Sequence, residues 1–236
     1  MNRPPDSKKL ISWFVDLFSS LTPVFSQHLK EAWERGLTLT ISDEDLETHL
    51  RKIPRCSINS RHQLIQFKII HSCNSFTKLH SFYPSVNQSC PKCKYADGTL
   101  GHLFWFCPKL NQFWSDIFKC FSDIYNCCTA PDPHIAILGG SRHLSTLEKV
   151  HRETIQYGLV VAKRIILTHW RSDAVPSYKA WLSEVTCLLH MERIRYNVSL
   201  NKAAFDKKWQ PFLLYLSCWC FVYLFYELYF SLRMCV

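Results

Sequence analysis

Apolar residues recur at helical spacing along much of the chain. From Ser60 to Ser72 they follow a period near 3.6 residues, with basic and amide side chains between them, and Pro108–Tyr125 repeats the pattern with a broad aromatic face. Ser42 precedes three acidic residues, which is typical of a helix N-terminus, so a helix is predicted from Ser42 to about Lys52, ended by Pro54. These patterns predict a mainly α fold with no substantial sheet.

The second half of the chain continues the helical pattern. Ser145 and Glu148 match a capping box, which predicts a long helix that reaches about Trp170. Ser177 is expected to cap a further helix that runs to about Tyr196. Proline and glycine residues at 131–140 predict a loop between the two halves.

Four segments are expected from these patterns. The N-terminal segment should contain two short helices without chemistry, around Leu10–Leu21 and near Trp33, separated by Pro23. The segments are an N-terminal helical part (1–59), a zinc-binding domain (60–130), a C-terminal helical region (131–210) and a hydrophobic tail (211–236).

The tail is unusually apolar. Phe212–Leu232 contains one charged residue, Glu227, and nine aromatic residues. A membrane-spanning helix needs about 20 apolar residues, so the length suffices, although the acid and the aromatic residues count against a span. A buried terminal helix and a non-native extension are the alternatives.

Four cysteine and histidine residues occur at metal-ligand spacing. They form the pattern C-x2-C-x8-H-x4-C: Cys90, Cys93, His102 and Cys107. Three thiolates and one imidazole suit tetrahedral Zn²⁺ in a closed, structural site. On a continuous helix His102 and Cys107 would point about 140° apart, so the helix break that Pro108 favours lets both reach one ion. Gly98 and Gly101 are expected to give the return loop its conformational freedom.

The remaining nine cysteines are expected to be free, buried thiols. The chain shows no signal-peptide pattern, which favours a reducing compartment and an intracellular location, in the nucleus or cytoplasm, with a membrane as the alternative. These cysteines are Cys56, Cys73, Cys120, Cys127, Cys128, Cys187, Cys218, Cys220 and Cys235. The isolated histidines His62, His71 and His80 are expected to form hydrogen bonds or lie on the surface, outside the metal site.

Charge is distributed unevenly along the chain. The formal net charge is +9, and no acidic residue occurs between Glu47 and Asp97. The interval contains eight basic residues: Arg51, Lys52, Arg55, Arg61, Lys68, Lys78, Lys92 and Lys94. A solvated basic face is one interpretation. The missing acids next to a metal loop favour the other, a surface that binds the phosphates of RNA or DNA.

The metal block resembles a known family. Cys90-Pro-Lys-Cys93, Gly98-Thr99, His102-Leu-Phe-Trp105-Phe-Cys107-Pro108 and Phe113-Trp114 are similar to the reverse-transcriptase zinc-binding domain at the C-terminal end of long interspersed element (non-LTR retrotransposon) polyproteins. The approach Arg61–Lys68 and Leu79–Pro84, and the later stretches Val160–Trp170 and Phe205–Phe212, also resemble that family. The resemblance covers about residues 30–212.

The resemblance implies a function without catalysis. In such elements the C-terminal region helps to grip nucleic acid while upstream domains cut DNA and copy RNA. No Asp-Asp pair occurs in this sequence, and residues 1–40 show no endonuclease counterpart. The chain is therefore expected to be a detached C-terminal fragment that is not an enzyme, with a retrotransposon polymerase as a possible partner in trans. A membrane-anchored or protein-interaction remnant, built around Phe212–Leu232, is the alternative.

Overall fold

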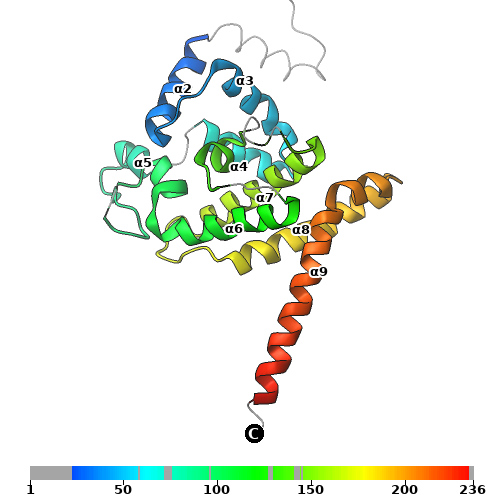
Figure 1. Cartoon of the computed structure of the whole chain (residues 1–236). Helices are drawn as coiled ribbons and strands as arrows, with labels where there is room; N and C mark the ends of the chain where they lie inside the picture. The colour runs from blue at the N-terminus through cyan, green and yellow to red at the C-terminus, as the bar shows by residue number, and fades with distance from the viewer. Residues whose placement is uncertain are drawn as a thin grey trace, which may run out of the picture.

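The computed structural model describes residues 23–57, 59–71, 76–95, 97–126, 130–140, 144 and 146–233; within these ranges the side chains of 23–26, 55, 76–78 and 218–233 are not described. This part of the chain is mainly helical, which confirms the predicted fold class (Figure 1). Its β pairing is limited to one isolated antiparallel bridge between Ser89 and Asp97.

The α-helices follow one another along the chain, with the longest connections before α6 and before α7. The α-helices are α2 (Pro23–Leu37), α3 (Asp43–Lys52), α4 (Ser60–Ile70), α5 (Phe76–Phe82), α6 (Asn111–Tyr125), α7 (Lys149–Thr168), α8 (Tyr178–Val198) and α9 (Lys202–Arg233). Two 3-10 turns, η2 (Ile53–Arg55) and η4 (Pro108–Leu110), and two π-helical turns, η3 (His102–Phe106) and η5 (His134–Leu138), complete the described elements.

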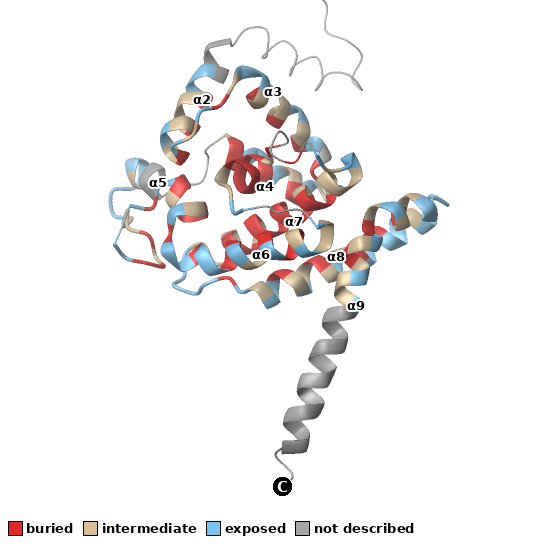
Figure 2. Cartoon of the chain, in the orientation of Figure 1, coloured by how far each residue is buried: buried red, intermediate tan, exposed pale blue. Residues whose placement is uncertain are grey.

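Helix α7 lies at the centre and contacts α4, α8, α9 and η5. Figure 2 shows many buried residues along α7 and on the parts of the fold around it. Gly158 has no room for a side chain, because a Cβ atom would lie 2.8 Å from the Phe121 ring, and its carbonyl accepts the indole N–H of Trp181 at 2.9 Å. One continuous core runs from Leu29 to Phe212 and includes residues from all four expected segments.

The predicted helix caps are present at both ends of the fold. Ser42 Oγ accepts the N–H of Asp45 at the start of α3, and Ser177 Oγ accepts the N–H of Ala180 at the start of α8. Pro23 begins α2, which fits the tolerance of proline in a first helical turn. Leu10–Leu21 lies outside the described residues.

Three expectations about local structure need correction. The predicted loop at 131–140 contains the buried turn η5, whose first N–H groups, of His134 and Ile135, bond to Asp132 Oδ1. Helix α5 was not expected, because seven residues are too few to show a period. The N-cap of α7 is Glu148, whose side chain makes no capping bond, and the expected cap Ser145 lies outside the described residues.

Helix α9 joins the core through its first half. Phe205, Trp209 and Phe212 are buried, and the helix continues through Pro211. It includes the predicted apolar segment Phe212–Leu232, whose side chains from 218 onward lie outside the described part. Within the described residues, no helix has the length and apolarity that a membrane span requires.

A group of buried polar side chains lies between α3, α4, η5 and α7. Lys163 Nζ and Gln66 Nε2 both donate to the carbonyl oxygen of Ile137, at 2.9 and 3.1 Å. His49 Nε2 lies 3.4 Å from His134 Nε2. Burial lowers the pKa of Lys163 to about 7, and burial followed by the nearby His134 lowers the pKa of His49 to about 3. His49 is therefore neutral at pH 7, whereas Lys163 loses its proton far more readily than an exposed lysine does.

Candidate metal centre

The loop that carries Cys90 and Cys93 is closed by backbone hydrogen bonds. Ser89 pairs with Asp97, and the N–H of Gly98 donates to the carbonyl oxygen of Gln88 at 2.6 Å. Inside the loop, the N–H of Lys94 donates to the carbonyl oxygen of Cys90 at 2.9 Å. This tight turn requires a left-handed residue, which is Lys94 with φ 65°. The two cysteines therefore project from one turn.

Gly101 serves packing instead of the expected conformational freedom of the return loop. Among the glycines of the described ranges, a positive φ occurs at Gly139 and at neither Gly98 nor Gly101. Gly101 is helical (φ −59°, ψ −42°), and a Cβ atom there would lie 2.0 Å from the carbonyl oxygen of Gly36. Gly101 is required because the end of α2 approaches its backbone closely.

A π-helical turn places the second pair of ligands. The N–H of Cys107 donates to the carbonyl oxygen of His102 at 3.0 Å, so the two residues lie one wide turn apart instead of on opposite sides of an α-helix. Cys107 then leaves the turn in an extended conformation (φ −65°, ψ 119°), as predicted for a residue before proline. Trp114 Nε1 donates to the carbonyl oxygen of Phe104 and anchors the turn on α6.

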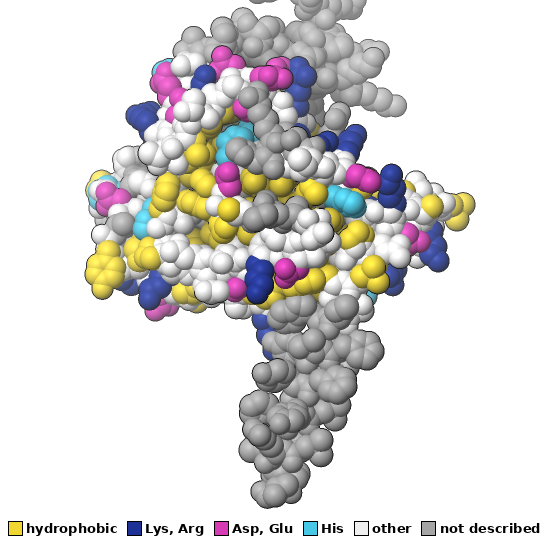
Figure 3. All heavy atoms as spheres, in the orientation of Figure 1, with side chains coloured by type: hydrophobic (Ala, Val, Ile, Leu, Met, Phe, Trp, Pro, Cys, Tyr) yellow, Lys and Arg dark blue, Asp and Glu magenta, His cyan; other side chains and the backbone are white. Residues whose placement is uncertain are grey.

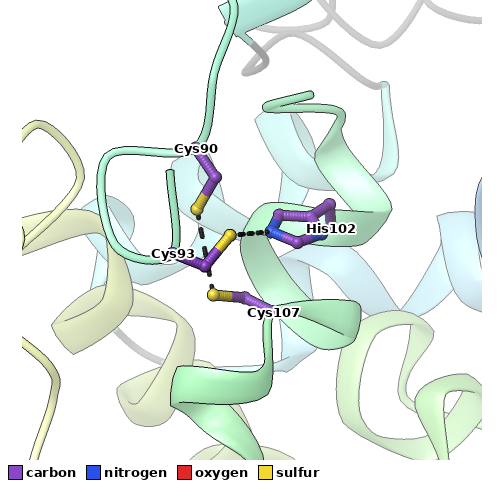
Figure 4. A group of neighbouring side chains, drawn as sticks. All are labelled: Cys90, Cys93, His102 and Cys107. Atoms are coloured by element: carbon purple, nitrogen blue, oxygen red, sulfur yellow. Dashed lines mark hydrogen bonds between the residues drawn. The ribbon is translucent and has the colours of Figure 1, made fainter. Parts of the chain in front are cut away.

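The four predicted ligands converge on one point (Figure 4). Their ligand atoms all lie within 4.8 Å of one another. Cys90 Sγ is 3.8 Å from Cys107 Sγ, which matches the separation of about 3.8 Å between two thiolates on a tetrahedral Zn²⁺. Cys93 Sγ is 3.2 Å from His102 Nε2, slightly shorter than the corresponding value of about 3.5 Å. The group can hold one metal ion.

The electrostatics of the group favour a cation. Burial raises the pKa of the Cys107 thiol to about 12, and the neighbouring Cys90 adds to this effect, although the backbone N–H of Lys109 opposes it. The Cys107 thiol therefore needs a positive ion nearby to ionise at neutral pH. Burial lowers the pKa of His102, which keeps its ring in the neutral form that binds metals.

Lys92 faces the interior instead of the solvent. Its Nζ donates to the carbonyl oxygens of His169, at 2.6 Å, and Ser172, at 3.3 Å, and the residue is buried. Both carbonyls belong to the C-terminal end of α7 and the residues after it, where a cation is favourable. We call this contact the Lys92 link. It joins the metal loop to the central helix, so Lys92 is not available to a phosphate.

The other predicted nucleic-acid contacts differ in their accessibility. Arg61 and Lys68 are exposed on α4, and Lys94 is exposed on the metal loop. Arg51 is paired with Glu47 at 2.6 Å, and Lys52 is half-buried, with its pKa lowered first by burial and then by Arg152. The side chains of Arg55 and Lys78 lie outside the described part. On the face in Figure 3, Lys and Arg are scattered among acidic and apolar side chains.

The remaining cysteines and histidines stay outside the metal group. His62, His71 and His80 each form a hydrogen bond, with Ser57 Oγ, the Phe67 carbonyl oxygen and the Val86 carbonyl oxygen, respectively. Cys56 and Cys120 are free and buried as predicted, whereas Cys187 is free but exposed. The expected buried thiols at 73, 127, 128, 218, 220 and 235 lie outside the described side chains.

One functional candidate was missed from the sequence. Arg171 is exposed and lines a groove beside the metal loop together with Lys94. The sequence alone does not reveal this groove, because Arg171 follows α7 and is distant in sequence from the acid-free interval. Only the folded chain brings it to the same groove as Lys94.

No protein-family model matches this sequence. The resemblance to reverse-transcriptase zinc-binding domains therefore rests on the quoted residues alone.

Proposed function

We propose that this chain is a non-catalytic nucleic-acid-binding module whose metal loop is stabilised by Zn²⁺. The observation that supports the proposal most directly is the convergence of three buried thiols and one imidazole. Thiolate and imidazole ligands in a four-ligand group favour Zn²⁺ over ions that prefer oxygen. Four protein ligands leave no open position for substrate or water, so the ion would organise a surface and would not catalyse a reaction.

The exposed cations support a phosphate-bearing ligand. The chain has a net charge of +9, and among the described side chains of the acid-free interval three exposed cations have no carboxylate partner: Arg61, Lys68 and Lys94. The fourth exposed cation, Arg51, is paired with Glu47. Unpaired surface cations attract the phosphates of RNA and DNA and release bound counterions when they bind.

The family resemblance favours nucleic acid over other anions. The matching block includes all four ligands and the aromatic residues that follow them, in the order found in reverse-transcriptase zinc-binding domains of non-LTR retrotransposons. We propose that the chain corresponds to that C-terminal region and acts beside a polymerase supplied by another chain.

Salt dependence tests the proposal. The purified full chain is titrated with RNA and with single-stranded DNA at 50 and 200 mM salt. If three cations contact phosphates, the affinity should fall about twentyfold between the two conditions. An affinity that does not change with salt would contradict phosphate binding.

Charge reversal tests the residues. Arg61→Glu and Lys68→Glu should each weaken binding about tenfold and reduce the salt dependence by about one phosphate contact. Lys119→Glu is the matched control, because Lys119 is exposed on α6, outside the predicted surface. Equal affinities for all three variants and the wild type would show that the phosphate surface lies elsewhere.

A further inference from the structure

A groove with a volume of about 380 Å³ lies beside the metal loop. One wall comes from α5, another from the metal loop, and Arg171 closes it from the segment after α7. Its lining includes Leu79, Val86, Asn87, Ser89, Lys94 and Arg171. The volume falls within the range of about 300–1,000 Å³ that small-ligand sites occupy.

The Lys92 link sets the distance between the two cations of the groove. Lys92 bonds to the carbonyl oxygens of His169 and Ser172, the residues on either side of the Arg171 region. Lys94 is two residues beyond Lys92 on the other wall and is held in its left-handed turn by the Cys90 carbonyl oxygen. The buried lysine thus fixes the place of two exposed cations that are far apart in sequence.

The groove is suited to an anion. Its lining includes no carboxylate, and neither Lys94 nor Arg171 has an ion-pair partner among the described residues. The acid Asp173 is not among the lining residues and interacts electrostatically with the buried Lys92. Asn87 Oδ1 accepts the N–H of Ser89 at 2.8 Å, which leaves the amide N–H groups of Asn87 as donors.

Exposed aromatic rings lie next to these cations in the chain. Tyr95, which follows Lys94, is 95% exposed. Phe82 and Tyr83, at the end of α5, are 71% and 61% exposed and come shortly before Val86 of the groove. By contrast, the aromatic residues of α6 are buried, as Phe113, Trp114 and Phe118 show. These three rings are left in solvent close in sequence to groove residues, so they are available to stack on another flat group.

We propose that this groove binds single-stranded nucleic acid. Lys94 and Arg171 hold successive phosphates, and Tyr95 stacks on an unpaired base, with Phe82 and Tyr83 as the platform on the opposite wall. Stacking on the rings favours a single strand over a duplex as the ligand, because the bases of a duplex are already stacked on one another and cannot reach the rings. The inference rests on the proposed function and adds to it the groove, Arg171 and the preference for unpaired bases.

The test compares one strand with its duplex. Fluorescence anisotropy measures the binding of a labelled 12-nucleotide RNA of mixed sequence, alone and annealed to its complement, to the full chain with zinc present. The wild type should bind the single strand at least tenfold more tightly than the duplex. Tyr95→Ala should weaken single-strand binding about tenfold and leave duplex binding unchanged, and Arg171→Glu should weaken single-strand binding about tenfold.

Matched variants separate the possible results. Tyr95→Phe keeps the ring and should retain wild-type affinity, and Lys119→Glu repeats the charge change on α6 and should also retain it. Binding without a single-strand preference, or binding that Tyr95→Ala and Arg171→Glu leave unchanged, overturns the groove while the proposed function stands. If neither RNA binds the wild type, the proposed function fails together with the inference.

Discussion

The ionisation of the Cys107 thiol depends on a nearby cation. Its thiol is fully buried, next to another thiol, and its pKa is raised to about 12. Without a nearby cation, the Cys107 thiol would remain protonated at neutral pH and would make only weak hydrogen bonds. The arrangement of the four side chains is therefore suited to a metal ion.

Zinc content tests the four ligands. Mass spectrometry of the purified chain should find one zinc per molecule, and Cys90→Ser and Cys107→Ser should each lose it, because a serine hydroxyl is a poor ligand for Zn²⁺. Cys187→Ser is the control, since Cys187 is a free, exposed thiol on α8, and it should retain the metal. A wild-type protein that contains no zinc would contradict the site.

The contact between α2 and η3 depends on two glycines that face each other. Gly101 presents bare backbone to the carbonyl oxygen of Gly36, whereas a Cβ atom on Gly36 itself would have no atom within 4 Å. The same substitution at the two positions should therefore have different consequences.

Gly101→Ala should lower the free energy of unfolding by about 1–3 kcal/mol, because the new methyl group meets backbone that cannot rotate away. Gly36→Ala should leave stability unchanged or raise it by up to about 1 kcal/mol, since alanine is the better helix former. Urea denaturation followed by circular dichroism measures both changes. Equal effects at the two positions would show that α2 does not approach η3 as described.

At the scale of elements, helices with local signals could be predicted. Helices α3 and α8 have serine caps, and α4 and α6 have periodic apolar faces, so their positions follow from neighbouring residues. The buried turn η5 could not be recognised, because prolines and glycines that normally mark a loop surround it. Its stability comes from packing against α4 and α7.

The metal site was predictable in composition but not in geometry. Spacing alone identifies the four ligands. The π-helical turn between His102 and Cys107, the close approach of Gly36 to Gly101 and the position of Arg171 all depend on contacts between distant parts of the chain. No pattern within a short stretch of sequence reports such contacts.

The stability of the whole molecule should depend on pH through its buried histidines. His49 and His62 have pKa values lowered to about 3 and about 4, mainly by burial, whereas the ordinary value in the unfolded chain is about 6.5. Both rings are neutral in the folded state, so their contribution is fully present above pH 6.5. It is lost as the pH falls, since the unfolded chain binds the protons first.

Denaturation at pH 7, 6 and 5 measures this effect. Below pH 6.5, the lowered pKa of His49 alone should reduce the free energy of unfolding by about 1.4 kcal/mol for each pH unit of acidification. His49→Gln should be less stable at pH 7 but should lose less stability on acidification than the wild type. A variant with the same pH dependence as the wild type would show that His49 is not held neutral.

The Lys92 link also determines the order in which the molecule is assembled during synthesis. Cys90 and Cys107 are 17 residues apart, but Lys92 and His169 are separated by 77. Closing the shorter loop loses less chain entropy, and it needs only residues that leave the ribosome early. The four side chains that could hold a metal ion can therefore come together while α7 is still being translated. The groove that holds Lys94 and Arg171 together becomes complete only after that helix has emerged and docked.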